Sequence, residues 1–403
     1  MADLLINGGR IVRPDGIADA SIAIESGKIV RISKKASAPK ADNVLDVKGC
    51  YILPGIIDPH VHFREPGNIR KEGWRTGSMA AAAGGVTTVL DMPNNKPPTT
   101  TVRRLNDKRG LAEEKSTVDF GFHFGSVGDN ISEIIKADRV ASTKVYMGDT
   151  TGGLTVRDDT ILGQIFESSR LISVHAEGRM IRKAAEIAKS KGKRLYICHV
   201  SSKDEADTLK ELKKDNVYAE VTPHHLFLDS SDLKRLGSLG LMKPELKTKT
   251  DRIALWECLR QGLIGTVGSD HAPHLLEEKD GDRPPYGVPG VETSLPLMLN
   301  AVNRRMITLE LLARIMSENP AGIFNIAGKG RIAEGFDADL AIVDLSVEKT
   351  IKDDSLFTRC GWSPYSGMKV KGWPVKTYLR GKLIFDDGIP IKVKGEGINY
   401  GSV

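Results

Sequence analysis

Cysteine is scarce in this sequence, and its few copies are not paired. The four cysteines, Cys50, Cys198, Cys258 and Cys360, lie far apart and form no Cys-x-x-Cys motif. A disulfide framework and a zinc site built from thiolates are therefore excluded. Cysteine usage of this kind is typical of proteins from a reducing compartment.

Aromatic residues, blocks of like charge and long apolar runs are also lacking. Aromatic residues make up only 5 %, and the basic residues behind the net charge of +6 are scattered, which disfavours nucleic-acid binding. No uninterrupted apolar stretch reaches membrane-spanning length, and the first residues lack a signal-peptide pattern. We expect a cytoplasmic protein with no nucleic-acid or membrane partner, whose positive charge permits an acidic substrate.

The two ends of the chain are both predicted to form β-structure. Short apolar segments separated by glycine turns indicate antiparallel strands. These segments cover residues 4–9, 21–30, 44–47, 337–344, 375–379 and 382–385. Each end is too short for a core of its own, so we expect one small composite, sandwich-like β domain built from residues 1–51 and 336–403.

Residues 52–335 alternate between apolar strands and helical stretches, which include 178–191, 203–214 and 250–261. Eight strand–helix units over such a length are typical of a closed (β/α)8 TIM barrel, in the α/β class. An open doubly wound sheet is the alternative, but no Gly-x-Gly-x-x-Gly motif follows a strand. The strands are expected to end near His62, Asn94, Gly125, Gly148, Glu177, Ser201, His224 and Asp270.

The first of these strands runs into the sequence Asp-Pro-His-Val-His-Phe-Arg, from Asp58 to Arg64. Alternate side chains of a strand share a face, so Asp58, both histidines and Arg64 are expected to point the same way. Two imidazoles on one buried face suit a divalent metal ion, with the neighbouring carboxylate to fix a tautomer. Taken alone, such a pair is more often two histidines of the core whose ring nitrogens are hydrogen-bonded to other protein groups.

Polar residues also end several later strands: Lys144, His175, His199, Asp270 and His274. Polar side chains at the carboxyl ends of barrel strands are placed for catalysis. Closure of the barrel makes the eighth strand the neighbour of the first, which brings Asp270 beside His60 and His62. One carboxylate and four imidazoles at one mouth indicate two metal ions. A lysine ammonium is no metal ligand, so chemistry alone leaves Lys144 as a surface residue.

The remaining histidines are expected to have structural roles. His123 is assigned to the barrel core or to support of the site. His271 is expected to pack or to orient its neighbours rather than to bind metal. His224 and His225, at the end of the seventh strand, are given no direct role.

Two motifs are specific enough to indicate a family. They are residues 58–67, which end in Arg-Glu-Pro-Gly, and residues 268–279, which contain Asp-His-Ala-Pro-His. With Asp-Met-Pro-Asn at 91–94 and the loop at 287–293, they give the whole chain a resemblance to the amidohydrolase superfamily and, within it, to dihydroorotases of the long, two-domain type. One segment departs: relatives often carry an Asn-Pro-Pro-Leu-Arg-like sequence where residues 243–247 read Lys-Pro-Glu-Leu-Lys.

The resemblance implies two zinc ions per chain and a role for Lys144. In such relatives the lysine is carboxylated by CO2, and its carbamate bridges the ions. Some relatives bridge with an aspartate instead, which leaves Asp149 as an alternative. By this likeness the first ion is held by His60, His62 and Asp270, the second by His175 and His199, and both by Lys144.

The implied reaction is the reversible cyclisation of N-carbamoyl-L-aspartate to L-dihydroorotate and water, in pyrimidine synthesis. The resemblance assigns proton transfer to Asp270. It assigns the substrate carboxylate to Arg64, Asn94 and His274. The alternative is an allantoinase or a hydantoinase/dihydropyrimidinase-type cyclic amidase, whereas a dead scaffold is disfavoured because every metal ligand is present. A homo-oligomer or an association with aspartate transcarbamoylase is the partnership that the resemblance suggests.

Overall fold

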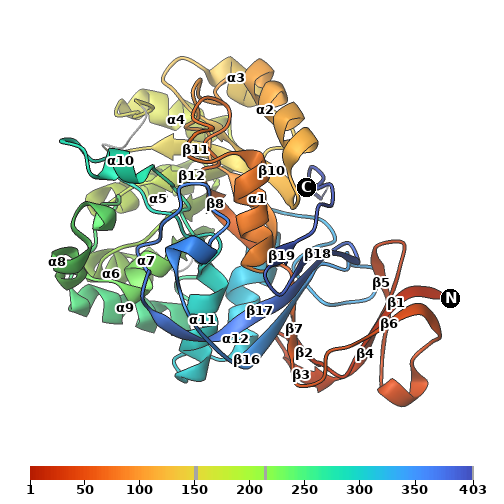
Figure 1. The fold of residues 1–403 in the computed structure, drawn as a ribbon. Helices are drawn as coiled ribbons and strands as arrows, with labels where there is room; N and C mark the ends of the chain where they lie inside the picture. Colours follow the sequence, from red (N-terminus) through yellow and green to blue (C-terminus); the bar gives the residue numbers. More distant parts are fainter. Residues whose placement is uncertain (149–152, 213–215, 402–403) are drawn as a thin grey trace.

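The computed structural model describes residues 1–148, 153–212 and 216–401. Within these residues, eight parallel strands follow one another in chain order and roll into a barrel (Figure 1). The first five are buried throughout, because their inner side chains fill the barrel and their outer ones lie under helices. The strands are β8 (Ile56–Val61), β9 (Val86–Asp91), β10 (Asp119–Gly125), β11 (Ser142–Tyr146), β12 (Leu171–His175), β13 (Arg194–Ile197), β14 (Val217–Val221) and β15 (Thr266–Val267).

The barrel closes between the segment after β15 and the end of β8. A parallel bridge joins Val61 to His271, and the backbone N–H of His62 donates to the carbonyl of His271 at 2.8 Å. The predicted (β/α)8 barrel and the predicted meeting of its first and last strands are therefore confirmed. Most strands end a few residues before the expected positions, because the chain turns outward into the rim loops once the ladder is complete.

At least one helix follows each barrel strand, and eight of these helices cover the outside of the barrel (Figure 1). In α5, Ile181, Ala184 and Ala188 are buried along one side, the three- to four-residue spacing of an amphipathic helix. The helices predicted at 178–191 and 250–261 are confirmed as α5 and α9, and that at 203–214 as α6, whose last expected residues lie outside the described part. These helices are α1 (Trp74–Ala83), α2 (Val102–Lys115), α3 (Ile131–Lys136), α4 (Asp159–Glu167), α5 (Arg179–Ser190), α6 (Lys203–Leu212), α9 (Lys249–Arg260) and α11 (Ser294–Asn303).

Shorter helices lie in the loops and after the barrel. Two of them, α7 and α10, stand on the rim loops that follow β14 and β15. The short α-helices are α7 (Pro223–Phe227), α8 (Leu233–Leu236), α10 (Leu276–Lys279), α12 (Leu309–Ala313) and α13 (Asn319–Ile323), and the 3-10 or π turns are η1 (Lys35–Ser37), η2 (Ser230–Asp232), η3 (Gly237–Gly240), η4 (Arg314–Glu318) and η5 (Asp353–Ser355). No helix among the described residues is long and apolar enough to cross a membrane.

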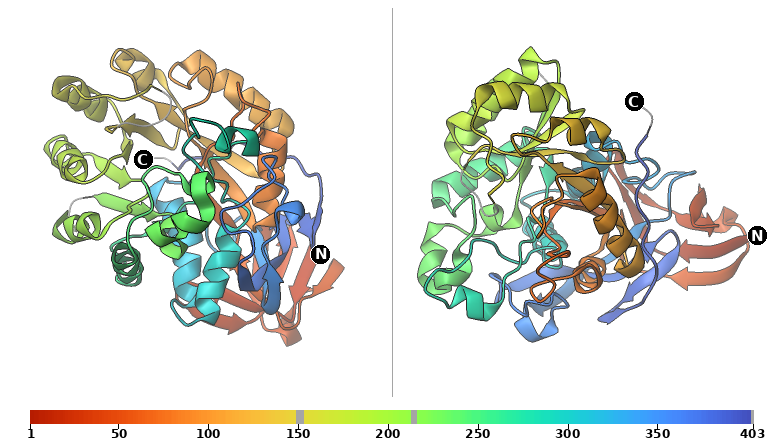
Figure 2. Two further views of the ribbon diagram at one scale, coloured as in Figure 1. Left: turned by 60° about the vertical axis from the view of Figure 1, so that its left-hand side comes forward. Right: turned by 90° about the horizontal axis from the view of Figure 1, so that it is seen from above.

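Both ends of the chain build two further sheets beside the barrel (Figure 2). One has the order β5-β4-β1-β6, and the other β19-β18-β17-β16-β7-β2-β3, which mixes strands from the two ends. The strands are β1 (Ala2–Asn7), β2 (Arg10–Arg13), β3 (Gly16–Asp19), β4 (Ser21–Glu25), β5 (Lys28–Ser33), β6 (Ala41–Asp46), β7 (Tyr51–Pro54), β16 (Leu340–Thr350), β17 (Lys369–Leu379), β18 (Lys382–Asp386) and β19 (Ile389–Pro390).

The pairing in these sheets corrects one expectation. β1 and β4 are antiparallel as predicted, but β6 pairs parallel to β1, and β2 pairs parallel to β7. β5 runs antiparallel to β4 and therefore in the direction of β1, and residues 34–40 cross over to the other edge of β1, so β6 runs in that direction as well. The domain boundaries at residues 51/52 and 335/336 stay a prediction.

A buried cluster of charges joins the end sheets to the barrel. The ammonium of Lys329 lies 2.7 Å from a carboxylate oxygen of Asp119 in β10, and 2.6 and 3.0 Å from Asp339 and Asp337. Arg380, just after β17, also pairs with Asp119. Because these charges neutralise one another away from water, they fix the barrel against the strands of the chain ends.

Candidate metal centre

A cavity opens at the carboxyl ends of the barrel strands and collects most of the predicted site residues. All six predicted metal ligands line it, together with Arg64 and Asn94. His274, predicted to contact substrate, lies just outside this lining. Tyr146, Lys243 and Tyr286 also line the cavity, although the sequence did not single them out as site residues.

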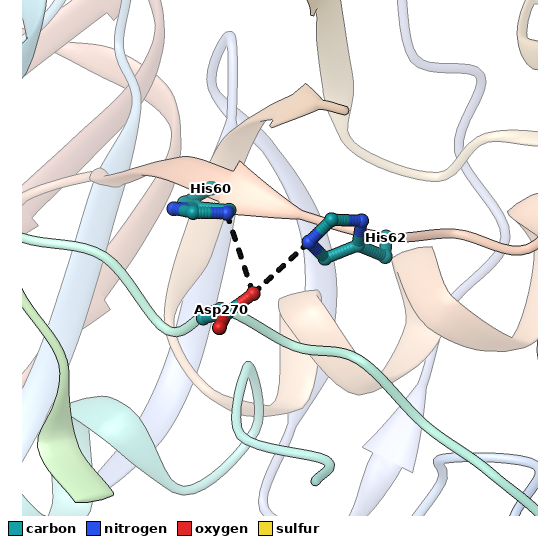
Figure 3. A group of neighbouring side chains, drawn as sticks. All are labelled: His60, His62 and Asp270. Atoms are coloured by element: carbon teal, nitrogen blue, oxygen red, sulfur yellow. Dashed lines mark hydrogen bonds and ion pairs between the residues drawn. The ribbon is translucent and has the colours of Figure 1, made fainter. Parts of the chain in front are cut away.

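His60, His62 and Asp270 form a close group in this cavity (Figure 3). The Nε2 atoms of His60 and His62 lie 3.3 and 3.0 Å from the same carboxylate oxygen of Asp270. All three residues are buried. Asp270 has a φ of 46°, a backbone conformation that non-glycine residues rarely adopt and that recurs at functional sites.

The other ring nitrogens of these two histidines are held by fixed partners. His60 Nδ1 lies 2.7 Å from Glu220 Oε1, and His62 Nδ1 lies 2.6 Å from Asn94 Oδ1. A proton on each Nδ1, donated to these oxygens, leaves the Nε2 lone pairs facing Asp270. An outer partner that fixes the tautomer in this way is usual for histidines that bind metal.

Asp58 does not have the role expected for it. Its carboxylate accepts hydrogen bonds from the backbone N–H groups of His60 and Ser269, at 3.2 and 3.0 Å, and so fixes the barrel closure rather than an imidazole. Burial raises its pKa to about 6. The missed carboxylate is Glu220, and its signal is a charged residue inside the otherwise apolar end of β14.

His175 and His199 form a second pair of imidazoles in the cavity. His175 Nδ1 and His199 Nε2 lie 2.9 Å apart. Burial, followed by the charge of Lys144, lowers the pKa of His175 to about 3. Burial and the neighbouring His175 hold the pKa of His199 well below its ordinary value. Two neutral imidazoles that face each other present two lone pairs, which suits a shared metal ion.

Lys144 lies beside both histidines and is fully buried. Its Nζ is 2.9 Å from Cys198 Sγ, and no carboxylate of the described residues is within ion-pair distance. A buried ammonium without an anion is costly, so an added carboxyl group that makes it anionic fits this position. Asp149, the alternative bridge, lies outside the described residues.

Arg64 stands at the rim of the group formed by His60, His62 and Asp270. Its Nε donates to the carbonyl of Pro273 at 3.2 Å, and none of the described carboxylates is within ion-pair distance of its guanidinium. His274 lies behind it, with Nδ1 3.0 Å from Lys71 Nζ and Nε2 3.0 Å from the carbonyl of Tyr286. Burial and the charge of Arg64 lower the pKa of His274 to about 2, so this imidazole is neutral. Its contact with substrate stays a prediction.

His123 and His271 are structural, as expected. His123 is buried between Ser142 Oγ at 2.7 Å and the carbonyl of Pro59 at 3.0 Å. His271 Nδ1 accepts from the backbone N–H of Gly290 at 3.1 Å, while its Nε2 faces Glu72. These bonds use both nitrogens of each ring, which leaves neither for a metal ion.

Known proteins match this chain along almost its whole length. It is 38 % identical to a dihydroorotase of Methanosarcina acetivorans, over 97 % of this chain and 94 % of that protein. It is 40 % identical to a dihydroorotase of Pyrococcus abyssi, over 98 % of each. Among solved structures, L-hydantoinase (dihydropyrimidinase) from Arthrobacter aurescens has a TM-score of 0.95 at 31 % identity, over 99 % of this chain and 100 % of that one.

A second structure, dihydropyrimidinase from Brevibacillus agri, has a TM-score of 0.91 at 26 % identity, over 99 % of both chains. The sequence model of the Amidohydrolase family matches residues 51–384, a stretch that includes all barrel strands and every residue of the cavity. The chain therefore belongs to the amidohydrolase family.

Proposed function

We propose that this chain is a dihydroorotase, which interconverts L-dihydroorotate plus water with N-carbamoyl-L-aspartate in pyrimidine synthesis. The archaeal dihydroorotases that it resembles support the assignment. The observation that carries it is Arg64, a partly buried guanidinium that lines the cavity beside His62 and has no carboxylate partner among the described residues. An unpaired cation at this depth needs an anion, and the ring carboxylate of dihydroorotate provides one.

The proposed cofactor is a pair of zinc ions, and the support is the chemistry of the donor set. His60, His62 and Asp270 would hold one ion, His175 and His199 the other, and carboxylated Lys144 both. Ions held there would supply Lewis acidity toward water and toward the amide carbonyl. Four imidazoles, one carboxylate and a buried lysine without a carboxylate partner are more groups than one ion needs, so this donor set suits two ions better than one.

The protein's own groups then have separate tasks. Asp270 takes the proton from the attacking water and passes it to the leaving ring nitrogen, and it returns that proton in the cyclisation. Arg64 pairs with the carboxylate on the ring, and the free amide nitrogen of Asn94 donates from the side, since its oxygen is engaged by His62. His274 supports this carboxylate site from behind Arg64.

The alternative is a cyclic amidase for uncharged rings, and the structural likeness to L-hydantoinase (dihydropyrimidinase) is the observation that favours it. A pocket for an uncharged ring has no use for an unpaired guanidinium, which would only add the cost of its desolvation. Cytoplasmic location, a homo-oligomer and an association with aspartate transcarbamoylase stay predictions.

A side-by-side turnover assay tests the assignment. Zinc-loaded protein is given L-dihydroorotate, allantoin and dihydrouracil at equal concentrations. We expect dihydroorotate to be hydrolysed with the highest kcat/KM, and cyclisation of N-carbamoyl-L-aspartate to occur with the same preparation. Hydrolysis of the uncharged rings as fast as dihydroorotate would replace the proposal with the cyclic-amidase alternative.

A further inference from the structure

Besides Lys144, two cations line the cavity, and both lack an acidic partner among the described residues. Arg64 lies at the end of the metal centre formed by His60 and His62, and its charge acts on His62. Lys243 lies in the loop between β14 and α9, and its charge acts on His175 at the other end. The cavity is therefore positive at both ends before any substrate enters.

The position of Lys243 is set by the ring of Tyr286. The ammonium lies 4.8 Å from the centre of this ring, within the range of a cation–π contact. Such a contact holds the charge over the cavity without neutralising it. Lys247, in the same loop, is different, because it pairs with Glu177 at 3.6 Å. Of these two lysines, Lys243 is thus the one whose charge remains available.

The loop that carries Lys243 is tied to the loop that carries Tyr286. The Nζ of Lys279 donates to the carbonyls of Leu241 and Pro285, each at 2.9 Å. The backbone N–H of Gly287 donates to the same carbonyl of Leu241 at 2.9 Å. These bonds flank both cavity residues, so Lys243 and Tyr286 are held together as a built part of the site rather than as a flexible rim.

The charge of the substrate changes during the proposed reaction. L-Dihydroorotate carries one carboxylate. Hydrolysis breaks the ring C–N bond and forms a C–O bond to water; one proton of the water goes to the released nitrogen and the other is lost to solvent, which leaves a second carboxylate at the reaction centre. One cation at the ring carboxylate suffices for the closed ring, whereas the open chain is a dianion. A second unpaired cation at the His175 end matches the additional charge.

We infer that Lys243 is a specificity-determining residue that binds the carboxylate formed by ring opening, so that the site holds the open dianion more tightly than the closed ring. This rests on the proposed function. Because a substitution cannot change the overall equilibrium constant, loss of Lys243 must lower kcat/KM by the same factor in both directions. The role of Lys243 is therefore visible in the separate binding constants of the two ligands and not in the ratio of the kcat/KM values.

The test uses zinc-loaded full-length protein and three variants. Lys243→Met keeps the length of the stem and removes the charge, Lys243→Arg keeps the charge, and Lys247→Met is the matched control in the same loop. Binding of N-carbamoyl-L-aspartate is measured as inhibition of dihydroorotate hydrolysis, and KM is measured for dihydroorotate. Metal content and thermal unfolding are checked for each variant.

In Lys243→Met, we expect the inhibition constant of N-carbamoyl-L-aspartate to rise about 10-fold or more, as for loss of a close charge pair. The KM for dihydroorotate should change less than about 3-fold, in line with a solvated contact. Lys243→Arg and Lys247→Met should stay near wild type for both ligands.

Two other outcomes have distinct meanings. If Lys243→Met weakens both ligands equally, or neither, while wild type turns over dihydroorotate, the inference about Lys243 is wrong and the proposed function stands. If wild type turns over neither compound, the proposed function fails, and the inference fails with it.

Discussion

Glu220 connects the two halves of the metal centre at the scale of single residues. Its Oε1 faces His60 Nδ1 at 2.7 Å and accepts from the backbone N–H of His199 at 3.0 Å, while its Oε2 accepts from the Tyr196 hydroxyl at 2.8 Å. One buried carboxylate thus orients a residue from each group of imidazoles. This explains why an acidic side chain is present inside β14, where an apolar residue would otherwise pack.

Glu220→Gln should lower the affinity for metal ions by about 10–100-fold, the usual scale for partners behind metal ligands. The amide keeps the size of the side chain but is a weaker acceptor for the imidazole proton. Competition with a chelator measures the effect. Tyr196→Phe, which removes only the partner of Oε2, is the control and should lose less. Wild-type metal affinity in Glu220→Gln would contradict the role given to this carboxylate.

Lys144→Ala should lose both metal and activity, because it removes the amine on which a carbamate forms. A short carboxylic acid added to the solution should restore part of both, since it can place an anionic oxygen in the vacated space. Lys144→Arg retains the charge but cannot form the carbamate, so it should be inactive as well. A metal-loaded and active Lys144→Ala without added acid would exclude the carbamate bridge.

Arg64→Ala tests the carboxylate contact. Truncation of a charge-assisted contact in a partly desolvated site costs on the order of 2–5 kcal/mol, so kcat/KM for dihydroorotate should fall by more than about 30-fold. The kcat/KM for dihydrouracil, which lacks the carboxylate, should change far less. Equal losses for the two rings would mean that Arg64 supports the fold of the site rather than recognising charge.

At the scale of elements, the rim loops after β14 and β15 depend on one buried lysine. Lys279, the last residue of α10, donates to carbonyls of both loops and has no exposed surface. Its ammonium also lies 5.6 Å from the centre of the Trp362 ring, which comes from the C-terminal part of the chain. The loops that shape the cavity are therefore joined to each other and to the segment between β16 and β17.

Lys279→Met should remove the Nζ donor from the carbonyl of Pro285 and one of two donors from the carbonyl of Leu241, while preserving the packing of the stem. We expect a loss of about 1–3 kcal/mol in the free energy of unfolding, the cost of unsatisfied buried acceptors. The KM for dihydroorotate should rise because the loops lose their fixed spacing, while metal content stays unchanged. Thermal unfolding, metal analysis and steady-state kinetics separate these effects. Altered metal content with a normal KM would mean that Lys279 supports the metal centre and not the spacing of the rim loops.

At the scale of the whole molecule, the barrel and the end sheets are joined by the cluster around Lys329. Lys329→Met removes the cation shared by Asp119, Asp337 and Asp339. Arg380 and Lys28 still pair with Asp119 and Asp337, whereas buried Asp339 keeps no cation partner among the described residues. The expected loss is about 3–5 kcal/mol, the scale for breaking a buried ion pair. Calorimetry should show a lower unfolding temperature. Lys28→Met, which removes a more exposed partner of Asp337, should lose less.

The same cluster predicts a loss of stability in acid. Burial opposes the ionisation of Asp337, but the charges and hydrogen bonds of Lys329 and Lys28 together outweigh it, so the pKa of Asp337 lies below its ordinary value of 3.8. A carboxylate with a depressed pKa stabilises the fold above its unfolded pKa, and this contribution is lost as the pH falls through the folded pKa. We therefore expect the free energies of unfolding of wild type and Lys329→Met, measured by denaturant titration between pH 6 and about 3, to approach each other as the pH falls. A constant difference between the two free energies over this pH range would contradict the role of the Asp337 carboxylate.

Much of the fold could be predicted because its signals are local. Apolar strands alternating with amphipathic helices such as α5 indicate a barrel, and turn residues mark where each strand ends. The sequence around His60 and His62 placed two imidazoles at one strand end, and closure of the barrel brought Asp270 to them. The parallel pairing of β6 with β1 was missed, because strand direction within a sheet depends on whether the connecting segment forms a hairpin or a crossover.

By itself, the sequence determined the order of the elements and the chemistry available at the strand ends. Only the tertiary structure decided which groups face each other: Glu220 rather than Asp58 beside the His60 ring, and Lys243 over Tyr286 at the cavity. His60 and Glu220 are 160 residues apart along the chain. A contact between such remote segments depends on strand register and on the conformation of rim loops, and no local pattern of residues encodes either.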